Sequence, residues 1–416
     1  MVELALALLA AMLLLQALLS VCFARLVRRR SVAQVPTAPC PAAEVLLCLR
    51  GVDPSLPGCL AALAAQRYGG PWRLLVVVDS LQDPAWGVVH TALAQWEAAG
   101  QASWCGARVL ALAPQPAGSR KSAALHQALG ALDAATQLVA LVDADAVVGP
   151  HWLYSLASAC GRPGVGAAGG NRWYLPERRS GPGMVRAIWN AGALVLMTLL
   201  AIPWGGSLAV RRELVEASGW RQRLQSSLCE DTALTTPLRR MGMGFRFEPA
   251  LLAIDRDDSL ALVPLIRWIG RQLLTARLHH PAWPLVALHG LGTSLVLLGV
   301  LGLLAVCLVQ GQAGAAALLA LGLLLYELGC GLILRGIQGA VAAAIEPDQR
   351  LPLRLWLRWL PLAQLVYGLA TLWALLARRV EWRGVHYRVL RAGVVPFSVA
   401  ASTGAARASI AAGWLR

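Results

Sequence analysis

Acidic residues and lysine are scarce in this chain of 416 residues. Asp and Glu total 22 against 37 Lys and Arg, which gives a formal net charge of +15, and Lys121 is the single lysine. Charged residues make up only 14% of the chain and hydrophobic residues 57%, a combination too apolar for an ordinary soluble enzyme. The nine cysteines show no Cys-x-x-Cys pair or zinc-ligand spacing, so we expect reduced, mostly buried thiols in a cytoplasmic setting.

The excess of positive charge consists of arginine, and its placement argues against nucleic acid as a partner. Arginines gather beside apolar runs, at 25–30 and 378–388. The positive-inside rule places such clusters on the cytoplasmic side of a membrane. The abundance of Ala, Leu, Gly and Arg indicates a GC-rich bacterial genome. We therefore predict a multi-pass protein of the bacterial cytoplasmic (inner) membrane that binds no nucleic acid, with its soluble domain facing the cytoplasm.

Four apolar stretches are long enough to cross a bilayer. The first, 2–23, is followed at once by arginines, so we expect an uncleaved anchor with its N-terminus outside. Three more lie near 285–309, 313–334 and 356–377. Three crossings after a cytoplasmic domain would leave the C-terminus outside, whereas the arginines of 378–388 favour the inside. Either one of these segments is re-entrant or residues 336–345 complete an extra crossing.

Between the membrane segments, short apolar runs alternate with helical patterns. We predict strands at 45–49, 74–78, 109–113 and 138–142, and helices at 56–66, 86–98 and 122–132. This order predicts an α/β fold with a mostly parallel sheet and helices on both faces, and ligands of such sheets lie at the carboxyl ends of the strands. A transmembrane helix at 185–204 would separate Asp143 from Glu230 by the membrane, so we expect a buried or interfacial helix there.

Two strand ends carry carboxylates. Asp143 and Asp145 follow the apolar run 138–142, where unpaired carboxylates are costly unless they meet a cation. A divalent, oxygen-seeking ion with a diphosphate is a suitable partner, and a solvated loop is the alternative. Asp79 ends another apolar run, either to accept hydrogen bonds from a base or ribose or to cap a turn.

Two helix starts carry the remaining candidates. The segment from Gly118 to Ser122 predicts a turn that opens a helix and presents Arg120 and Lys121. Helix N-termini bind anions and cations there oppose the helix dipole, so phosphate is the favoured partner; an exposed basic turn is the alternative. Adjacent Glu230 and Asp231 begin a further helix. They either cap its N-terminus or supply a general base that removes the proton from an acceptor hydroxyl.

In this order and spacing, the four motifs resemble membrane-bound glycosyltransferase family 2, whose catalytic domain has the GT-A fold. The resemblance covers about 44–280 and is closest to bacterial relatives of ceramide glucosyltransferase. It implies that Asp79 contacts the uracil or ribose, and that Asp145 binds the Mg²⁺ or Mn²⁺ that bridges the diphosphate, with Asp143 beside it helping to hold the nucleotide. Lys121 and Arg120 would approach the nucleotide.

The same resemblance implies the acceptor side of the site. Gly205, Gly206 and Ser207 match the segment that lines the donor sugar and the acceptor, and Asp231 of the Glu230-Asp231 pair matches the catalytic base. The resemblance also sets the expected division of the chain: an N-terminal transmembrane anchor (1–24), a basic and Pro-rich linker (25–43), a cytoplasmic GT-A catalytic domain (44–258), an interfacial helix (259–284), C-terminal transmembrane helices (285–378) and a basic tail (379–416), disordered at 403–416.

One motif of the family is broken here. Many membrane members carry Gln/Arg-x-x-Arg-Trp on the interfacial helix, whereas Gln272 is followed by Thr275 and Ala276 where Arg and Trp would stand. Arg271, Gln272 and Arg277 are our candidates to meet the leaving diphosphate or the acceptor. The broken motif and the small number of spans disfavour a processive polysaccharide synthase.

The resemblance implies an inverting, metal-assisted single displacement that moves a sugar from a UDP-sugar to a membrane lipid. UDP-glucose is the default donor, with UDP-galactose or an N-acetylhexosamine next, and sphingolipid-like, hopanoid-like and glycerolipid acceptors all fit. The alternatives are a processive polysaccharide synthase and a non-catalytic nucleotide-sugar-binding membrane protein. A transporter is disfavoured because the late spans carry few charges, chiefly Glu327.

Overall fold

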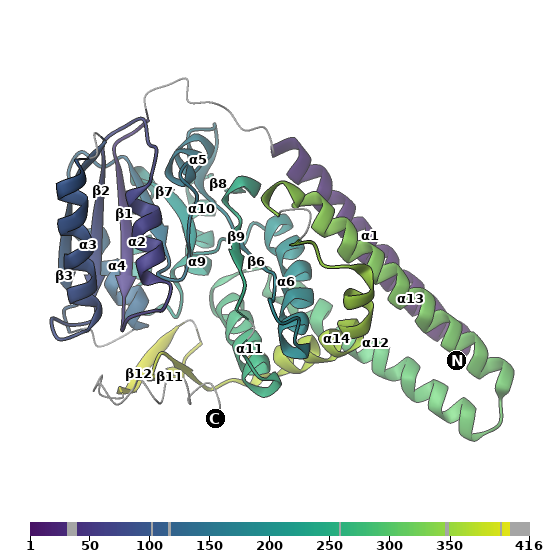
Figure 1. Cartoon of the computed structure of the whole chain (residues 1–416). Helices are drawn as coiled ribbons and strands as arrows, with labels where there is room; N and C mark the ends of the chain where they lie inside the picture. The colour runs from purple at the N-terminus through teal and green to yellow at the C-terminus, as the bar shows by residue number, and fades with distance from the viewer. Residues whose placement is uncertain are drawn as a thin grey trace.

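The computed structural model describes residues 1–30, 40–100, 103–114, 118–257, 259–345, 349–391 and 393–399. An α/β domain lies on one side and a group of long helices on the other, with α6 (Gly181–Leu199) and α11 (Leu262–His279) between them (Figure 1). Residues 31–39 of the predicted linker and the whole segment 403–416 fall outside the described residues.

A seven-stranded sheet forms the centre of the α/β domain, in the order β3-β2-β1-β4-β7-β5-β8. Its strands are β1 (Ala43–Leu49), β2 (Trp72–Val78), β3 (Trp104–Ala111), β4 (Leu138–Val142), β5 (Val165–Gly169), β7 (Ser207–Arg211) and β8 (Gly244–Phe247). β7 is antiparallel to both of its neighbours and the other pairs are parallel, which confirms the mostly parallel sheet. β3 begins well before the predicted residue 109, because an edge strand that is partly exposed lacks the continuous apolar run of a central strand.

Helices cover both faces of this sheet, as predicted. One face carries α2 (Leu56–Ala64), α3 (Ala85–Ala99) and α5 (Trp152–Cys160), and the other carries α4 (Arg120–Gly130), α7 (Arg212–Ala217) and α8 (Trp220–Arg223). Successive β1 residues alternate between the two apolar clusters, with Val45 and Leu47 on one face and Leu46 on the other. The short helices α9 (Glu230–Ala233) and α10 (Thr235–Arg240), the 3₁₀ turn η1 (Pro249–Leu251) and the pair β6 (Arg172–Tyr174) and β9 (Ala253–Asp255) complete the domain.

Four helices are long and apolar enough to cross a membrane, one N-terminal and three C-terminal. They are α1 (Val2–Arg30), α12 (Trp283–Val309), α13 (Ala313–Ala340) and α14 (Leu353–Leu376). α1 and α13 lie side by side along most of their length (Figure 1). α6 is the buried or interfacial helix that we expected at 185–204, because it packs between β6, α14 and α1. A 3₁₀ turn, η2 (Ala342–Ala344), follows α13.

The segment expected as a basic tail instead contains a three-stranded antiparallel sheet. It consists of β10 (Arg379–Trp382), β11 (Val385–Val389) and β12 (Val394–Val399). Val380, Val385, Tyr387 and Val394 are buried in the same apolar cluster as the long helices. The sheet lies beneath the α/β domain, beside α11 and the end of α14 (Figure 1). This C-terminal sheet therefore joins the membrane helices to the α/β domain.

All nine cysteines are free thiols, and seven of them are buried or half-buried, as expected. Cys22 on α1 and Cys105 on β3 are the two exposed ones.

Candidate active site

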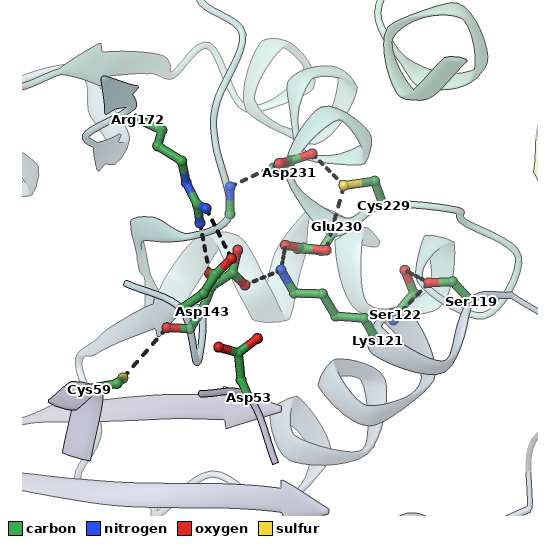
Figure 2. Close-up of polar contacts among 12 residues, drawn as sticks. Asp53, Cys59, Ser119, Lys121, Ser122, Asp143, Arg172, Cys229, Glu230 and Asp231 are labelled. Carbon is green, nitrogen blue, oxygen red and sulfur yellow. Dashed lines mark hydrogen bonds and ion pairs between the residues drawn. The ribbon is translucent and has the colours of Figure 1, made fainter. Parts of the chain in front are cut away.

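Lys121 brings two of the predicted motifs into one site. Its Nζ lies 2.6 Å from Asp143 Oδ1 and 2.6 Å from Glu230 Oε1. Figure 2 shows the ammonium group between these two carboxylates, with Arg172 approaching from the other side. Asp143 follows β4 and Glu230 begins α9, so a strand end and a helix start that are distant in sequence meet at the carboxyl edge of the sheet.

The start of α4 holds Lys121 in place. Ser119 caps the helix, with its hydroxyl oxygen accepting the Ser122 N–H at 3.1 Å, as the Gly/Ser turn predicted. Although burial opposes the charge, the carboxylates of Asp143 and Glu230 hold the pKa of Lys121 well above its ordinary value. The one lysine of the chain is therefore a fixed positive charge between two acids.

Asp145 pairs with an arginine that the sequence analysis did not single out. Arg172 binds both carboxylate oxygens of Asp145, at 2.7 and 2.9 Å, and also lies 2.9 Å from Asp255. Although burial opposes ionisation, Arg172, Arg383 and Lys121 hold the pKa of Asp145 below its ordinary value. Asp145 is thus an ionised carboxylate that is still 36% exposed.

These two carboxylates suit a divalent cation. Asp143 and Asp145 offer the hard oxygen ligands that Mg²⁺ and Mn²⁺ prefer, and both side chains are partly exposed at the sheet edge. Arg172 keeps Asp255 as a partner if Asp145 turns to an ion. A second group, Cys229 with the neighbouring acids, is a poorer site, because burial raises the pKa of the Cys229 thiol well above its ordinary value and a neutral thiol is a weak ligand.

Asp231 is oriented by three hydrogen bonds. Its Oδ2 accepts the Gly205 N–H at 2.9 Å, and its Oδ1 accepts the Thr232 N–H at 2.5 Å and the Cys229 thiol at 2.9 Å. A carboxylate has about four lone-pair sites, so Oδ2 keeps one for a further donor. Asp231 is therefore fixed in orientation and retains the capacity to accept a proton.

Gly205 separates the two acids of the α9 pair. A Cβ at this position would lie 1.8 Å from Glu230 Oε1, and its N–H already binds Asp231. Any side chain here would displace Glu230 from Lys121. The glycine thus sets the spacing of this part of the site.

Gly206 and Ser207 line the site less directly than expected. The Gly206 carbonyl accepts the Asp143 N–H at 3.4 Å, and a Cβ on Gly206 would meet the Trp204 ring. Ser207 is buried, and its hydroxyl accepts the Trp152 indole N–H at 2.9 Å. This segment therefore holds the backbone of Asp143 in position.

Asp79 is enclosed by two arginines. Arg50, directly after β1, lies 2.5 Å from Asp79 Oδ2, and Arg120 Nε lies 2.9 Å from Oδ1. Oδ1 nevertheless accepts no hydrogen bond of good geometry among the described residues. The carboxylate is thus held in position by two guanidinium groups.

The three candidates on α11 have different surroundings. Arg271 stacks over the Trp382 ring at 5.3 Å, and burial, followed by the charge of Arg383, lowers its pKa to about 10. The Gln272 side chain has no hydrogen-bond partner within the described part of the chain. Arg277 lies away from the carboxylates, because its guanidinium donates to the carbonyl groups that end α14, at Ala374, Leu375 and Ala377.

Sequence reasoning did not single out Arg50 or Arg172. Arg50 directly follows an apolar run, so the rule that selected Asp79 would have found it. Gly205 belongs with Gly206 and Ser207 to the segment that the resemblance assigns to the donor sugar and the acceptor. Arg172 lies on a strand of three residues whose pattern carries no signal.

The fold and this site define a membrane-bound glycosyltransferase with a GT-A-type sheet. The chain belongs to glycosyl transferase family 21, whose family model matches residues 6–395. This finding confirms the resemblance to the membrane-bound enzymes of family 2.

Solved structures with a similar arrangement are distant in sequence. A mannosyltransferase from Pyrobaculum calidifontis in complex with GDP-Man and Mn²⁺ is 16% identical, with a TM-score of 0.48, over 89% of this chain and 99% of that one. Glucosyl-3-phosphoglycerate synthase from Mycobacterium tuberculosis in complex with Mn²⁺, UDP-glucose and phosphoglyceric acid is 15% identical, with a TM-score of 0.33, over 52% and 72%. A search of curated proteins returned no match.

Proposed function

We propose that this glycosyltransferase moves a sugar from a UDP-sugar, by default UDP-glucose, to a lipid acceptor in the membrane, with inversion at the anomeric carbon. The observation that carries the proposal is Lys121, which ties Asp143 to Glu230 and so places the donor-side carboxylates next to Asp231. The site lies on a domain joined to apolar helices through α6 and α11, which suits an acceptor that arrives from the bilayer.

The donor would lie along the carboxyl edge of the sheet. Asp79, held by Arg50 and Arg120, would accept a hydrogen bond from the imide N–H of uracil or from a ribose hydroxyl. Asp145, with Asp143, would hold Mg²⁺ or Mn²⁺, which when bound would neutralise charge on the diphosphate.

The reaction would be a single displacement. Asp231 takes the proton from the acceptor hydroxyl, whose oxygen forms a bond to the anomeric carbon on the face opposite the diphosphate. The bond between that carbon and the diphosphate oxygen breaks, and the nucleoside diphosphate leaves with the electron pair. Lys121 is a fixed cation near the developing negative charge, and fixed charges stabilise a transition state without reorganising.

The test is sugar transfer by the purified protein in lipid nanodiscs. Radiolabelled UDP-sugars and GDP-mannose are offered with mixed bacterial lipids and Mg²⁺ or Mn²⁺, and Asp231→Asn and Asp145→Ala run in parallel. The expected result is one new glycolipid from a UDP-sugar that disappears in both variants. A ladder of longer products would instead identify a processive polysaccharide synthase, and donor binding without transfer to any lipid would indicate a non-catalytic protein.

A further inference from the structure

The turn between β10 and β11 has an unusual conformation. Trp382 pairs with Val385, so Arg383 and Gly384 form a two-residue turn, with φ of 47° and 72°. A type I′ turn needs positive φ at both positions, a conformation that is unfavourable for a residue other than glycine. A non-glycine residue persists in this region when its surroundings hold it there, and such residues cluster at binding sites.

Arg383 is docked on the loop that follows β1. Its carbonyl accepts the Arg50 Nε–H at 3.1 Å, and its guanidinium lies 3.1 Å from Asp53 and donates to the Arg50 carbonyl at 3.5 Å. Arg50 in turn binds Asp79. The turn is therefore tied directly to the residue that holds the expected base-binding carboxylate.

The rest of the C-terminal sheet contacts the start of α4. The Tyr387 hydroxyl accepts the Arg120 N–H at 3.1 Å, and the Val394 carbonyl accepts the Gly118 N–H at 3.2 Å. Val394 also donates to the Ser226 carbonyl at 2.8 Å, a few residues before the Glu230-Asp231 pair. The sheet thus borders the site on the side of Asp79 and on the side of Lys121.

Charge accumulates where the turn meets α11. Arg271 stacks on Trp382, the residue before Arg383, and has no carboxylate partner in the described part of the chain. After burial, the charge of Arg383 is the next cause that lowers the pKa of Arg271, and Arg383 also helps to lower the pKa of Asp145. Two guanidinium groups in such an arrangement favour an anion between them, and guanidinium groups bind phosphate oxygens well.

We propose that Arg383 is a donor-binding residue whose guanidinium binds the diphosphate of the nucleotide-sugar, while Trp382 holds Arg271 beside it. Asp53 is the partner of Arg383 when no donor is bound, and the Arg383 side chain is 49% exposed, so it can turn toward the diphosphate. The inference rests on the proposed function. It also explains why an arginine occupies a turn position that glycine would fill without strain.

The test compares binding of UDP and of uridine to the full-length protein in nanodiscs with Mg²⁺, by calorimetry for UDP and by competition for uridine. Arg383→Gln is expected to weaken UDP binding about 10-fold and to leave uridine binding unchanged, because only UDP has the diphosphate. Arg383→Lys keeps the positive charge and is expected to weaken UDP binding less than Arg383→Gln does. Arg388→Gln is the matched control, since Arg388 is an exposed arginine of the same sheet, and it is expected to bind both ligands as the wild type does.

The outcomes separate this inference from the function on which it rests. Unchanged UDP affinity in Arg383→Gln, with wild-type binding intact, would overturn the inference alone. An equal loss for UDP and uridine would also overturn it, because Arg383 would then only hold the turn and Arg50 in place. Failure of the wild type to bind UDP would overturn the proposed function, which names a UDP-sugar as the donor, and this inference together.

Discussion

Lys121 is the residue on which the arrangement of acids depends, because it neutralises Asp143 and the fully buried Glu230 at once. Lys121→Met is expected to lower kcat/KM at least 100-fold and the free energy of unfolding by about 3 kcal/mol, since removing one partner of a buried ion pair leaves an uncompensated charge. Transfer assays and denaturant unfolding measure the two effects.

The double variant Lys121→Met with Glu230→Gln separates the two roles of the lysine. It is expected to regain most of the stability, because the buried charge is gone, and to remain inactive. Recovery of transfer activity in the double variant would show that Lys121 only compensates Glu230.

Gly205 gives the next test at a single residue. Gly205→Ala is expected to lower kcat at least 100-fold, because its Cβ would collide with Glu230 and shift the N–H that orients Asp231. Circular dichroism and a transfer assay check that the fold persists while activity falls. Gly87→Ala on α3, where a Cβ meets nothing within 4 Å, is the control and is expected to keep full activity. Comparable activity in the two variants would contradict this view of the site.

Residues that follow an apolar run or open a helix could be predicted from the sequence, because position along the chain determines where they lie in a parallel sheet. Asp143 and Lys121 are of this kind, and the structure places them in contact. Arg172 could not be predicted, because its role depends on how β6 lies across the site. The partners of Arg277 could not be predicted for a similar reason, since they are carbonyl groups that meet it only when α14 packs on α11.

At the scale of elements, α11 is tied to the segment that leads to the catalytic pair. His279 Nε2 accepts the Leu228 N–H at 3.2 Å, and burial, with a contribution from Arg223, lowers the pKa of His279 to about 4. Between pH 6.5 and 4 the unfolded chain therefore binds a proton that the folded chain does not. The contribution of His279 to the free energy of unfolding is therefore fully present above pH 6.5. It is lost as the pH drops toward 4, which lowers the free energy of unfolding by up to about 3 kcal/mol.

Thermal unfolding between pH 4 and 7.5 measures this dependence. His279→Gln is expected to flatten it, because an amide oxygen accepts the same hydrogen bond without titrating. The dependence of the unfolding temperature on pH is expected to become weaker without disappearing, since burial also lowers the pKa of His280 to about 4. His90→Gln on the exposed face of α3 is expected to unfold as the wild type does at every pH. If His279→Gln showed the same pH dependence of thermal unfolding as the wild type, His279 would not be the source of that dependence.

The strands of the C-terminal sheet could have been predicted from the alternation of apolar and polar residues in the sequence. In β11, Val385, Tyr387 and Val389 alternate with polar residues, which is the period of a half-buried strand. The arginines of this segment were interpreted only as a signal of membrane topology. Its position against α4 could not be predicted, because that contact joins residues 267 positions apart in the chain.

At the scale of the whole molecule, the contacts at the two ends of α14 bear on the conflict between the number of spans and the position of the arginines. The Gln338 side chain near the end of α13 binds the backbone of Leu351 just before α14, and Arg277 on α11 binds the last carbonyl groups of α14. The strands that follow then contact the α/β domain. We propose that both ends of α14 lie on the side of the membrane where the α/β domain is, so that α14 enters the membrane region without crossing it.

Reporter fusions test this topology. If α1, α12 and α13 cross and α14 does not, alkaline phosphatase inserted after Gln312 is expected to be active outside and green fluorescent protein there to be dark. At the C-terminus the reverse is expected, with fluorescence and no phosphatase activity, because the C-terminal sheet must reach the same compartment as Lys121 and Asp79. Active phosphatase at the C-terminus would mean that α14 crosses the bilayer. The C-terminal sheet could then not contact α4, and Arg383 could not reach the donor.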